Sequence, residues 1–105
     1  MADSFFQKVY AVVALIPCDR VLSYGDIAKL IGYPRRARFV GFAMRACPEG
    51  LPWHRVVMAD GTITGGDFAP VREMLLKQEG VPFLPDGRVD MKLCRAVVGQ
   101  DFAES

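Results

Sequence analysis

Hydrophobic residues recur at every third or fourth position in the first part of the chain, which is the spacing of one face of an α-helix. Over residues 4–16 the repeating apolar positions are Phe6, Val9, Val13 and Ile16. Ser4 and Gln7 have the spacing of a capping box, which often opens a helix. Pro17 cannot continue the helix because its backbone lacks an N–H group. We therefore expect a first helix from Ser4 to Ile16.

Two more helices are predicted close together after this segment. The first covers residues 24–31, with Ser23 and Asp26 at capping-box spacing before it and Gly32 placed to end it. The second begins at Pro34 and reaches about residue 47. Two short helices joined by a tight turn that contains glycine are typical of a helix-turn-helix.

The helix predicted over residues 34–47 has two different faces. At about 100° per residue, the side expected to pack inward consists of Val40, Ala43, Met44 and Cys47. The opposite side consists of Arg38, Gly41, Phe42 and Arg45. A glycine between arginines lets a DNA strand approach the backbone closely. Phe42 is unusual for a face exposed only to water, and the pattern leaves open whether it contacts DNA or a partner protein.

Two β-branched runs then flank an Asp-Gly pair. Residues 55–58 and 62–64 lie on either side of Ala59-Asp60-Gly61, a pattern that indicates a β-hairpin. A helix-turn-helix followed by a hairpin is the arrangement of a winged helix. The expected fold class is therefore mainly α with a small β-hairpin wing, a winged helix-turn-helix DNA-binding domain.

The last third of the chain has weaker patterns. A fourth amphipathic helix is expected over residues 70–79. The residues predicted to point inward on it are Val71, Met74 and Leu75. Turn formers within residues 81–89 predict a second short hairpin, and residues 91–98 are expected to be helical. No linker or repeat divides the sequence, so residues 1–105 should form a single domain, with residues 99–105 as a flexible tail.

The net charge of +1 hides an uneven distribution of charge. Five of the 13 Lys and Arg residues lie between Ile27 and Pro48, and they are Lys29, Arg35, Arg36, Arg38 and Arg45. That segment has no acidic residue, whereas the eight other cations share the rest of the chain with all 12 acids. Phosphate binding needs such a local cluster, although a solvated helix face can have the same composition.

Other features of the composition exclude several kinds of site. The three cysteines, at positions 18, 47 and 94, form no CxxC pair, so we expect neither a zinc site nor a disulfide framework. No metal or cofactor is expected, and a reducing cytoplasm is the expected location, with nucleoid association if the source is bacterial. The apolar run 9–16 is too short to span a bilayer, and Asp3 does not suit a signal peptide, so no membrane association is expected.

Three motifs in order resemble those of the O6-alkylguanine-DNA alkyltransferases, over about residues 5–81. Residues 21–28, VLSYGDIA, are similar to V-x-S/T-Y-G-x-I/L-A, and residues 34–44, PRRARFVGFAM, to P-x-A-A-R-x-V-G-x-A-M. Residues 52–57, PWHRVV, are similar to the family's P-C-H-R-V, with Trp53 where the enzymes have their alkyl-accepting cysteine. An indole has no nucleophilic heteroatom. The chain therefore resembles the alkyltransferase-like proteins, which bind alkylated guanine in DNA without repairing it.

This resemblance implies how the chain would contact DNA. Arg38 matches the finger residue that enters the duplex from the minor groove and fills the gap left by a flipped nucleotide. Tyr24 matches a tyrosine beside that nucleotide's 3′ phosphate, although its place in an apolar stripe also suits a core residue. Further DNA contacts are expected from Ser23, Arg35, Arg36, Ala37, Gly41 and Arg45.

The resemblance also implies a lesion pocket. Its expected residues are Trp53, Tyr24, Met44, Val56 and His54. Trp53 would contact the alkyl group and the base, and the Val56 carbonyl would accept a hydrogen bond from the guanine amino group. His54 and Glu79 match the pair that activates the cysteine in the enzymes. Without a thiol they are expected as a structural remnant, whose hydrogen bond holds the turn at residues 52–55.

Two departures from the family pattern lie near the pocket mouth. Cys47 stands where the family commonly has an asparagine before proline. Residues 64–72, TGGDFAPVR, stand where the family has G-Y/G-x-G-x-x-x-K; the tyrosine is missing and Asp67 is present. We expect a roomier mouth that admits larger O6 adducts.

Taken together, these features predict a monomeric, non-enzymatic protein that binds O6-alkylguanine in double-stranded DNA by nucleotide flipping and flags it for nucleotide excision repair proteins. Two alternatives are weighed against this prediction. A true alkyltransferase would need another acceptor, of which Cys47 is the nearest in sequence, but that residue is expected on the inward helix face. A winged-helix transcription regulator would read base edges, but the exposed helix face offers no Asn or Gln for adenine.

Overall fold

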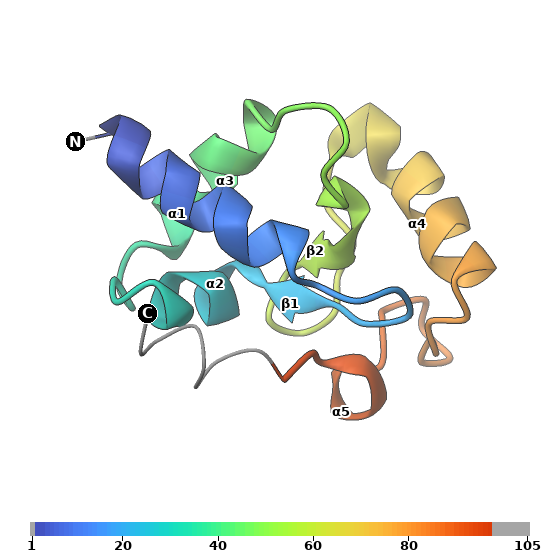
Figure 1. The fold of residues 1–105 in the computed structure, drawn as a ribbon. Coiled ribbons are helices and arrows are strands. Elements are labelled where there is room, and N and C mark those ends of the chain that lie inside the picture. Colours follow the sequence, from blue (N-terminus) through green and yellow to red (C-terminus); the bar gives the residue numbers. More distant parts are fainter. Residues whose placement is uncertain (1, 98–105) are drawn as a thin grey trace.

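Helices make up most of the fold, and two short strands lie near its centre (Figure 1). The structure is a computed structural model that describes residues 2–97, with the side chains of residues 5–97. In chain order the elements are α1 (Ala2–Ala14), β1 (Leu22–Ser23), α2 (Tyr24–Leu30), α3 (Ala37–Arg45), the 3-10 turn η1 (Trp53–Arg55), β2 (Val56–Val57), the 3-10 turn η2 (Gly66–Phe68), α4 (Ala69–Gln78) and α5 (Met91–Cys94). The predicted mainly helical class with a small sheet is confirmed.

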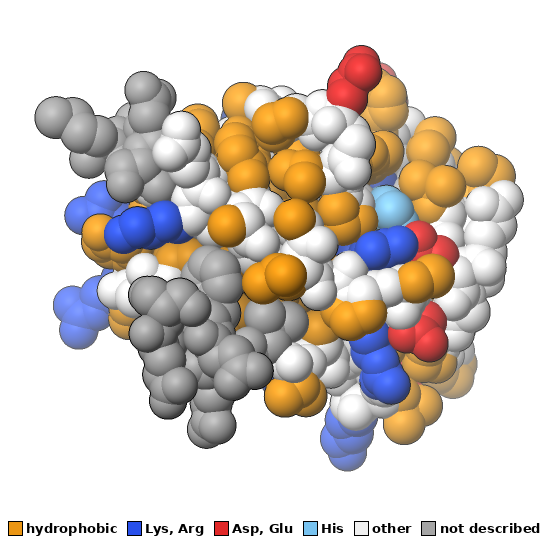
Figure 2. Space-filling view, viewed as in Figure 1, with side chains coloured by type: hydrophobic (Ala, Val, Ile, Leu, Met, Phe, Trp, Pro, Cys, Tyr) orange, Lys and Arg blue, Asp and Glu red, His pale blue; other side chains and the backbone are white. Residues whose placement is uncertain are grey.

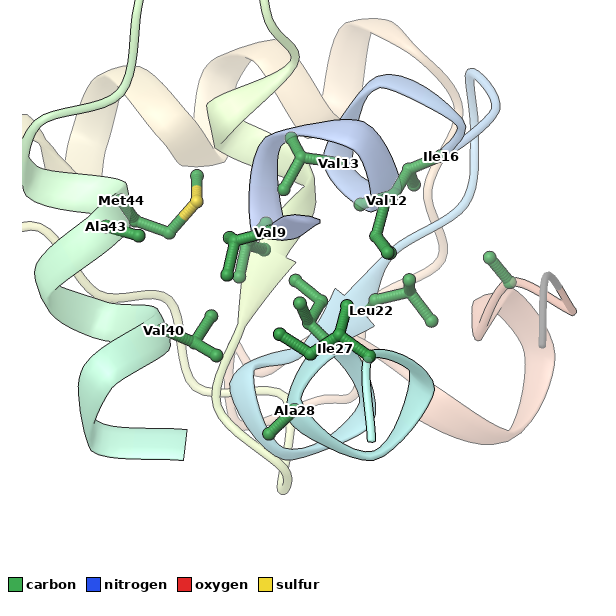
Figure 3. Close-up of a cluster of buried hydrophobic side chains, with 13 residues drawn as sticks. Val9, Val12, Val13, Ile16, Leu22, Ile27, Ala28, Val40, Ala43 and Met44 are labelled. Atoms are coloured by element: carbon green, nitrogen blue, oxygen red, sulfur yellow. The ribbon is translucent and has the colours of Figure 1, made fainter. Parts of the chain in front are cut away.

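The main core lies where the first three helices meet (Figure 3). Its buried side chains are Val9, Val12, Val13 and Ile16 from α1 and the turn after it, Ile27 and Ala28 from α2, and Val40, Ala43 and Met44 from α3. Most of these residues belong to the predicted apolar stripes; Val12 was not predicted, and Phe6, which was, is only partly buried. Leu22 of β1 and Val56 of β2 belong to the same cluster, which anchors the sheet to the helices.

The two strands pair in parallel, with Leu22 opposite Val56 and Ser23 opposite Val57. The predicted hairpin strands are therefore wrong: residues 62–64 form no strand, and their backbone hydrogen bond to Met58 (N–H to the Thr62 carbonyl, 3.0 Å) closes only a turn. The valines of β2 are both fully buried, as in a covered parallel strand, rather than alternately buried and exposed. The pairing brings the strand that leads into α2 beside the strand that follows η1, which positions the site.

Of the two predicted capping boxes, the one at α2 is present and the one at α1 is not. α1 starts at Ala2, so Ser4 lies inside the helix instead of capping it. α2 has the predicted capping box, because the Ser23 hydroxyl accepts from the Asp26 N–H (2.9 Å) and the Asp26 carboxylate accepts from the Ser23 N–H (3.0 Å). This reciprocal cap satisfies two backbone donors and fixes where the chain enters α2.

α3 is shorter than predicted but has the predicted faces. It begins at Ala37 rather than Pro34, because the Arg36 N–H donates to the Tyr33 carbonyl (2.9 Å) and closes a turn before the helix. Its buried side chains are Val40, Ala43 and Met44. Its exposed side chains include Arg38, Phe42 and Arg45. The basic face is therefore turned to solvent on a helix that the core holds firmly.

α4 is rotated relative to the prediction. Val71 and Met74 were expected to point inward, but they are 40% and 51% exposed. The buried residues are Arg72 and Leu76, one helical turn apart on a neighbouring face, while Leu75, also expected inward, is partly buried. The reason is that Arg72 buries its aliphatic stem and directs its guanidinium to backbone carbonyls of the neighbouring turn, so a charged residue takes the inward position.

The chain after α4 packs against earlier segments and forms a second, smaller core with them. Its members are Val21, Val57, Leu76, Val81, Val89 and Cys94. The second predicted hairpin is present as a single antiparallel bridge between Phe83 and Val89. α5 covers one turn rather than residues 91–98, because Arg95 is extended and pairs with Val21. The end of that predicted helix at Val98 and the predicted tail 99–105 lie outside the described residues.

Candidate nucleic-acid interface

A hollow of about 1140 Å³ opens between the start of α2, the basic face of α3, the η1 turn and the loop before α4. The predicted site residues on its wall are Tyr24, Ala37, Arg38, Gly41, Met44, Arg45 and Trp53. They come from all three sequence motifs, which the strand pairing and the packing of α2 on α3 bring together. Its volume lies slightly above the range for small-molecule pockets, about 300–1,000 Å³.

Trp53 forms one wall of this hollow, and Arg72 covers its ring. The Arg72 guanidinium carbon lies 4.7 Å from the centre of the indole ring, a cation–π contact. Its Nη1 donates weakly to the carbonyls of Trp53 (3.3 Å) and Val56 (3.4 Å). Within the described residues, its buried Nε has no hydrogen-bond partner. Arg72 therefore places a buried donor and a positive charge beside the aromatic wall.

Sequence reasoning assigned no role to Arg72, although the segment that contains it had been matched to a family motif ending in lysine. The signal that could have revealed its role is Gly65. This glycine has φ +114°, and a Cβ atom built on it would lie 2.8 Å from Arg72 Nε. A side chain at this position would push the guanidinium off Trp53, so the glycine allows the close approach of the loop.

The position of Tyr24 is compatible with both of the roles that the sequence left open, and its contact with the flipped nucleotide stays a prediction. Its ring packs against the main core, and it also lines the hollow. Its hydroxyl shares a short hydrogen bond with Thr64 Oγ1, 2.7 Å away. This bond ties the first residue of α2 to the loop that carries Gly65, so the helix and the loop hold opposite parts of the wall in register.

His54 and Arg55 both bind Glu79, at the end of α4. His54 Nε2 lies 2.8 Å from Glu79 Oε2, and the expected hydrogen bond of the turn is present. Arg55 donates from Nε to Oε1 (3.0 Å) and from Nη2 to Oε2 (2.7 Å), and its Nη1 donates to the Ile16 carbonyl (2.8 Å). Pale blue, blue and red side chains adjoin on the face drawn in Figure 2. The cluster fastens η1 to α4 and to the end of α1.

This arrangement changes the acidity of its carboxylate. Hydrogen bonds from Arg55 and then from His54 outweigh desolvation and lower the pKa of Glu79 from 4.5 to about 2. The same carboxylate raises the pKa of Arg55 above its ordinary value. Glu79 is therefore a fixed anion at neutral pH, committed to two partners and unsuited to accept a proton from a reacting group.

Several predicted site residues do not face the hollow. Ser23 was expected to contact DNA, but only 2% of it is exposed, and its hydroxyl is used by the helix cap; that expectation is corrected to a role in holding Tyr24. His54 points to Glu79 and is not part of the wall. Val56 is fully buried in β2, with its carbonyl facing Arg72. The predicted contact of that carbonyl with guanine stays a prediction.

The basic residues of α3 and of the turn before it are exposed. Arg38 and Arg45 lie on the rim of the hollow, while Arg35 and Arg36 precede the helix and lie outside the wall. A Cβ built on Gly41 would meet no atom within 4 Å, so space remains open above the helix backbone there. The face can thus be approached closely by a polyanion.

The loop before α4 forms the remaining side of the mouth. Thr64, Gly65, Gly66 and Phe68 belong to the wall, and Phe68 is 65% exposed. Two consecutive glycines and the exposed Phe68 ring share this side, and the predicted roomy mouth stays a prediction. Asp67 is exposed and is not part of the wall.

The cysteines differ in their surroundings. Cys47 is half-buried on the wall of the hollow, and burial raises the pKa of its thiol. A raised pKa keeps the thiol protonated at neutral pH, and the thiolate is the nucleophilic form. Cys94 is buried and donates to the Asp90 carbonyl, and Cys18 is exposed in the loop after α1. Of the three, Cys47 alone lies on the wall of the hollow.

The described part of the chain has neither a cluster of metal-binding side chains nor a helix fit to cross a membrane. No group of three or more His, Cys, Asp and Glu side chains among residues 5–97 is placed to hold a metal ion. None of the helices within residues 2–97 has the length and the hydrophobicity that crossing a membrane requires.

Comparison with known proteins places this geometry in a family context. A family model described as "6-O-methylguanine DNA methyltransferase, DNA binding domain" matches residues 4–81. A DNA base-flipping protein of Escherichia coli is 50% identical over 97 residues, which cover 89% of this chain and 74% of that protein. Alkyltransferase-like protein 1 of Schizosaccharomyces pombe is 40% identical over 96 residues, which cover 87% of this chain and 89% of that protein.

A solved structure agrees with the sequence comparisons. S. pombe Atl1 in complex with damaged DNA containing O6-carboxymethylguanine matches this fold with a TM-score of 0.80 and 33% sequence identity. The match covers 91% of this chain and 97% of that one. The likeness therefore extends over nearly the whole of both chains, beyond the residues matched by the family model.

Proposed function

The chain belongs to the family of the 6-O-methylguanine DNA methyltransferase DNA-binding domain, and from this premise we propose that it binds O6-alkylguanine in duplex DNA by flipping the nucleotide into the hollow beside Trp53. It leaves the alkyl group in place. The observation that carries the proposal is the position of Trp53, which stands on the wall of the pocket at the motif position of the acceptor cysteine.

The basic face of α3 supplies the means to open the duplex. Extrusion of a nucleotide costs a few kcal/mol of lost stacking and pairing. Arg38 is exposed on the rim, where a planar cation can enter the gap in the stack and gain from the negative potential of the groove. The extruded base then has an aromatic surface to contact, and stacking on an aromatic side chain is worth about 1–3 kcal/mol per base.

The pocket binds without chemistry because the residue at the acceptor position is not a nucleophile. Trp53 offers an N–H donor and no nucleophile. With Trp53 at the acceptor position, the His54–Glu79 pair has no thiol proton to remove, and its hydrogen bond holds the η1 turn instead. Alkyl transfer to Cys47 would need a thiolate that its burial disfavours.

Recognition without repair would leave a bound lesion in place as a signal. We propose that the partners are double-stranded DNA and nucleotide excision repair proteins, and that the chain acts as a monomer. The exposed loop of Phe68 and the outer face of α4 remain accessible beside the site.

One experiment tests the binding and the missing reaction together. Matched duplexes that contain guanine or O6-methylguanine at one position are titrated with the protein, and DNA and protein are then recovered and analysed by mass spectrometry. We expect tighter binding of the O6-methylguanine duplex, with the methyl group still on DNA. Equal affinity for both duplexes would contradict lesion recognition, and a 14-Da adduct on a protein cysteine would revive the alkyltransferase alternative.

A further inference from the structure

A continuous row of cations and aromatic rings crosses the surface from α1 to α3. Its members, named here the aromatic–cation strip, are Lys8, Tyr33, Arg36, Phe39, Phe42 and Arg45. Basic and hydrophobic side chains lie next to one another at the left edge of Figure 2 as well. Three neighbouring exposed aromatic rings are unusual on a surface that contacts only water.

Each member of the strip contacts the next one. Arg36 lies 6.0 Å from the ring centre of Tyr33 and 5.2 Å from that of Phe39. The rings of Phe39 and Phe42 meet edge to face, with centres 5.6 Å apart, and Arg45 lies 5.9 Å from the Phe42 ring. From Lys8 to Arg45 the order is therefore cation, ring, cation, ring, ring, cation.

Each ring of the strip is substantially exposed. Tyr33, Phe39 and Phe42 are 40%, 42% and 43% exposed. Among the described residues, Lys8, Arg36 and Arg45 form no ion pair with an acidic side chain. The strip thus presents flat apolar surfaces together with uncompensated positive charge, and a suitable ligand must offer flat apolar groups joined by anions.

The end of the strip meets the pocket. Phe42 and Arg45 line the hollow, and Phe42 lies one helical turn after Arg38 on the same face of α3. A nucleotide in the hollow is covalently continuous with the strand on either side of it. When Arg38 occupies the gap in the duplex, the ring of Phe42 must therefore meet the neighbouring sugars or bases.

We propose that the aromatic–cation strip binds the duplex beside the flipped nucleotide, with Phe39 and Phe42 as an apolar wedge against sugars and base edges and the cations on phosphates. This inference rests on the proposed function, because it takes Arg38 as the residue that enters the duplex. Apolar wedges of this kind favour a kinked duplex by partly unstacking a base step. The wedge contributes affinity whether or not the base in the pocket carries an alkyl group.

The test uses substitutions that separate the wedge from the charges. Phe39→Ala, Phe42→Ala and the double variant are titrated with matched duplexes containing guanine or O6-methylguanine at several salt concentrations. Leu93→Ala is the matched control, because Leu93 is 63% exposed on α5 and outside the strip. Circular dichroism checks that each variant folds, and Arg36→Gln serves as the charge comparison.

The double variant is expected to bind both duplexes at least tenfold more weakly, with an unchanged salt dependence, since the lost contacts are apolar. Arg36→Gln should instead reduce the salt dependence, and Leu93→Ala should bind as the wild type does. Wild-type affinity in the double variant would overturn the wedge and leave lesion recognition intact. Loss of affinity in that variant, with no preference of the wild type for the lesion, would support the wedge and contradict the proposed function. No binding of the wild type to either duplex would overturn both.

Discussion

Glu79 is the residue whose charge most strongly links the site to stability. Its pKa is about 2 in the folded protein and 4.5 ordinarily, so its ionised form favours folding. This contribution is complete above pH 4.5 and is lost as the pH falls from about 4.5 to about 2. One pKa unit corresponds to about 1.4 kcal/mol, so Glu79→Gln should lower the free energy of unfolding at pH 7 by about 3 kcal/mol.

Urea unfolding of the wild type and Glu79→Gln between pH 7 and pH 2 measures this effect. The variant should lose less stability on acidification, because its amide does not titrate. Glu73→Gln is the control, since Glu73 pairs with Lys77 on the exposed side of α4, where an ion pair contributes less than about 1 kcal/mol. An identical loss of stability between pH 4.5 and pH 2 in the wild type and in Glu79→Gln would refute the assignment.

Gly65 should control the contact between Arg72 and Trp53. A methyl group at residue 65 would lie 2.8 Å from Arg72 Nε, whereas one at Gly66 would meet nothing within 4 Å. Both glycines have positive φ, so both alanine variants are strained: the backbone cost is about 1–2 kcal/mol at Gly66, which is left-handed with φ +53°, and larger at Gly65, whose φ of +114° lies outside that region. Only Gly65→Ala should also displace the guanidinium from the indole ring.

The fluorescence of Trp53 provides the measurement, because it is the only tryptophan in the chain. Gly65→Ala should change the emission of the free protein and weaken binding to an O6-methylguanine duplex, while Gly66→Ala should keep the wild-type emission. If the two variants had the same emission, the packing of Arg72 on Trp53 would not depend on the missing side chain at residue 65.

At the scale of elements, the cap of α2 connects folding to the site. Ser23→Ala removes the hydroxyl that accepts from the Asp26 N–H, and loss of such a cap costs about 0.5–2 kcal/mol. Because Tyr24 is the first residue of α2, the variant should also loosen its bond to Thr64 and weaken DNA binding. Asp90→Ala removes the cap of α5 and should reduce stability without weakening DNA binding.

Thermal unfolding and duplex titrations of the two cap variants separate these effects. Equal DNA affinity in Ser23→Ala and the wild type, with α2 destabilised, would show that the cap does not position Tyr24. A loss of affinity in Asp90→Ala comparable to that of Ser23→Ala would show that both act only by lowering overall stability.

The elements also show which features a sequence can predict. The helices α1, α2 and α3 follow from local spacing, because each apolar stripe and the cap at Ser23 lie within a few residues of one another. The partner of Val56 could not be inferred in this way, since a parallel strand pairs with a segment more than 30 residues earlier. The Asp-Gly turn forms, but its second arm is not a strand, so local turn chemistry alone gave the wrong pairing.

The candidate site was predictable to a similar degree and for a related reason. The three motifs identified Tyr24, Arg38 and Trp53, and the fold brings them to one hollow. Arg72 was missed because a charged residue in an amphipathic helix is normally assigned to the solvent side, which also led to the wrong inward face of α4. Its burial depends on carbonyls of the η1 turn, a contact that only the tertiary structure reveals.

At the scale of the whole molecule, the uneven charge makes DNA binding depend on salt in a position-specific way. Each phosphate contact contributes about −0.9 to the slope of log K against log salt concentration. Arg35 is exposed just before α3, within the segment that has five cations and no acid. Arg35→Gln should therefore make the slope less negative by about 0.9, with the same relative loss of affinity on guanine and O6-methylguanine duplexes.

Lys92→Gln removes an equal charge from α5, outside that segment, and should leave the slope unchanged. Equal shifts in slope for the two variants would mean that net charge, rather than the basic face of α3, sets the affinity, and the placement of DNA over α3 would then be wrong.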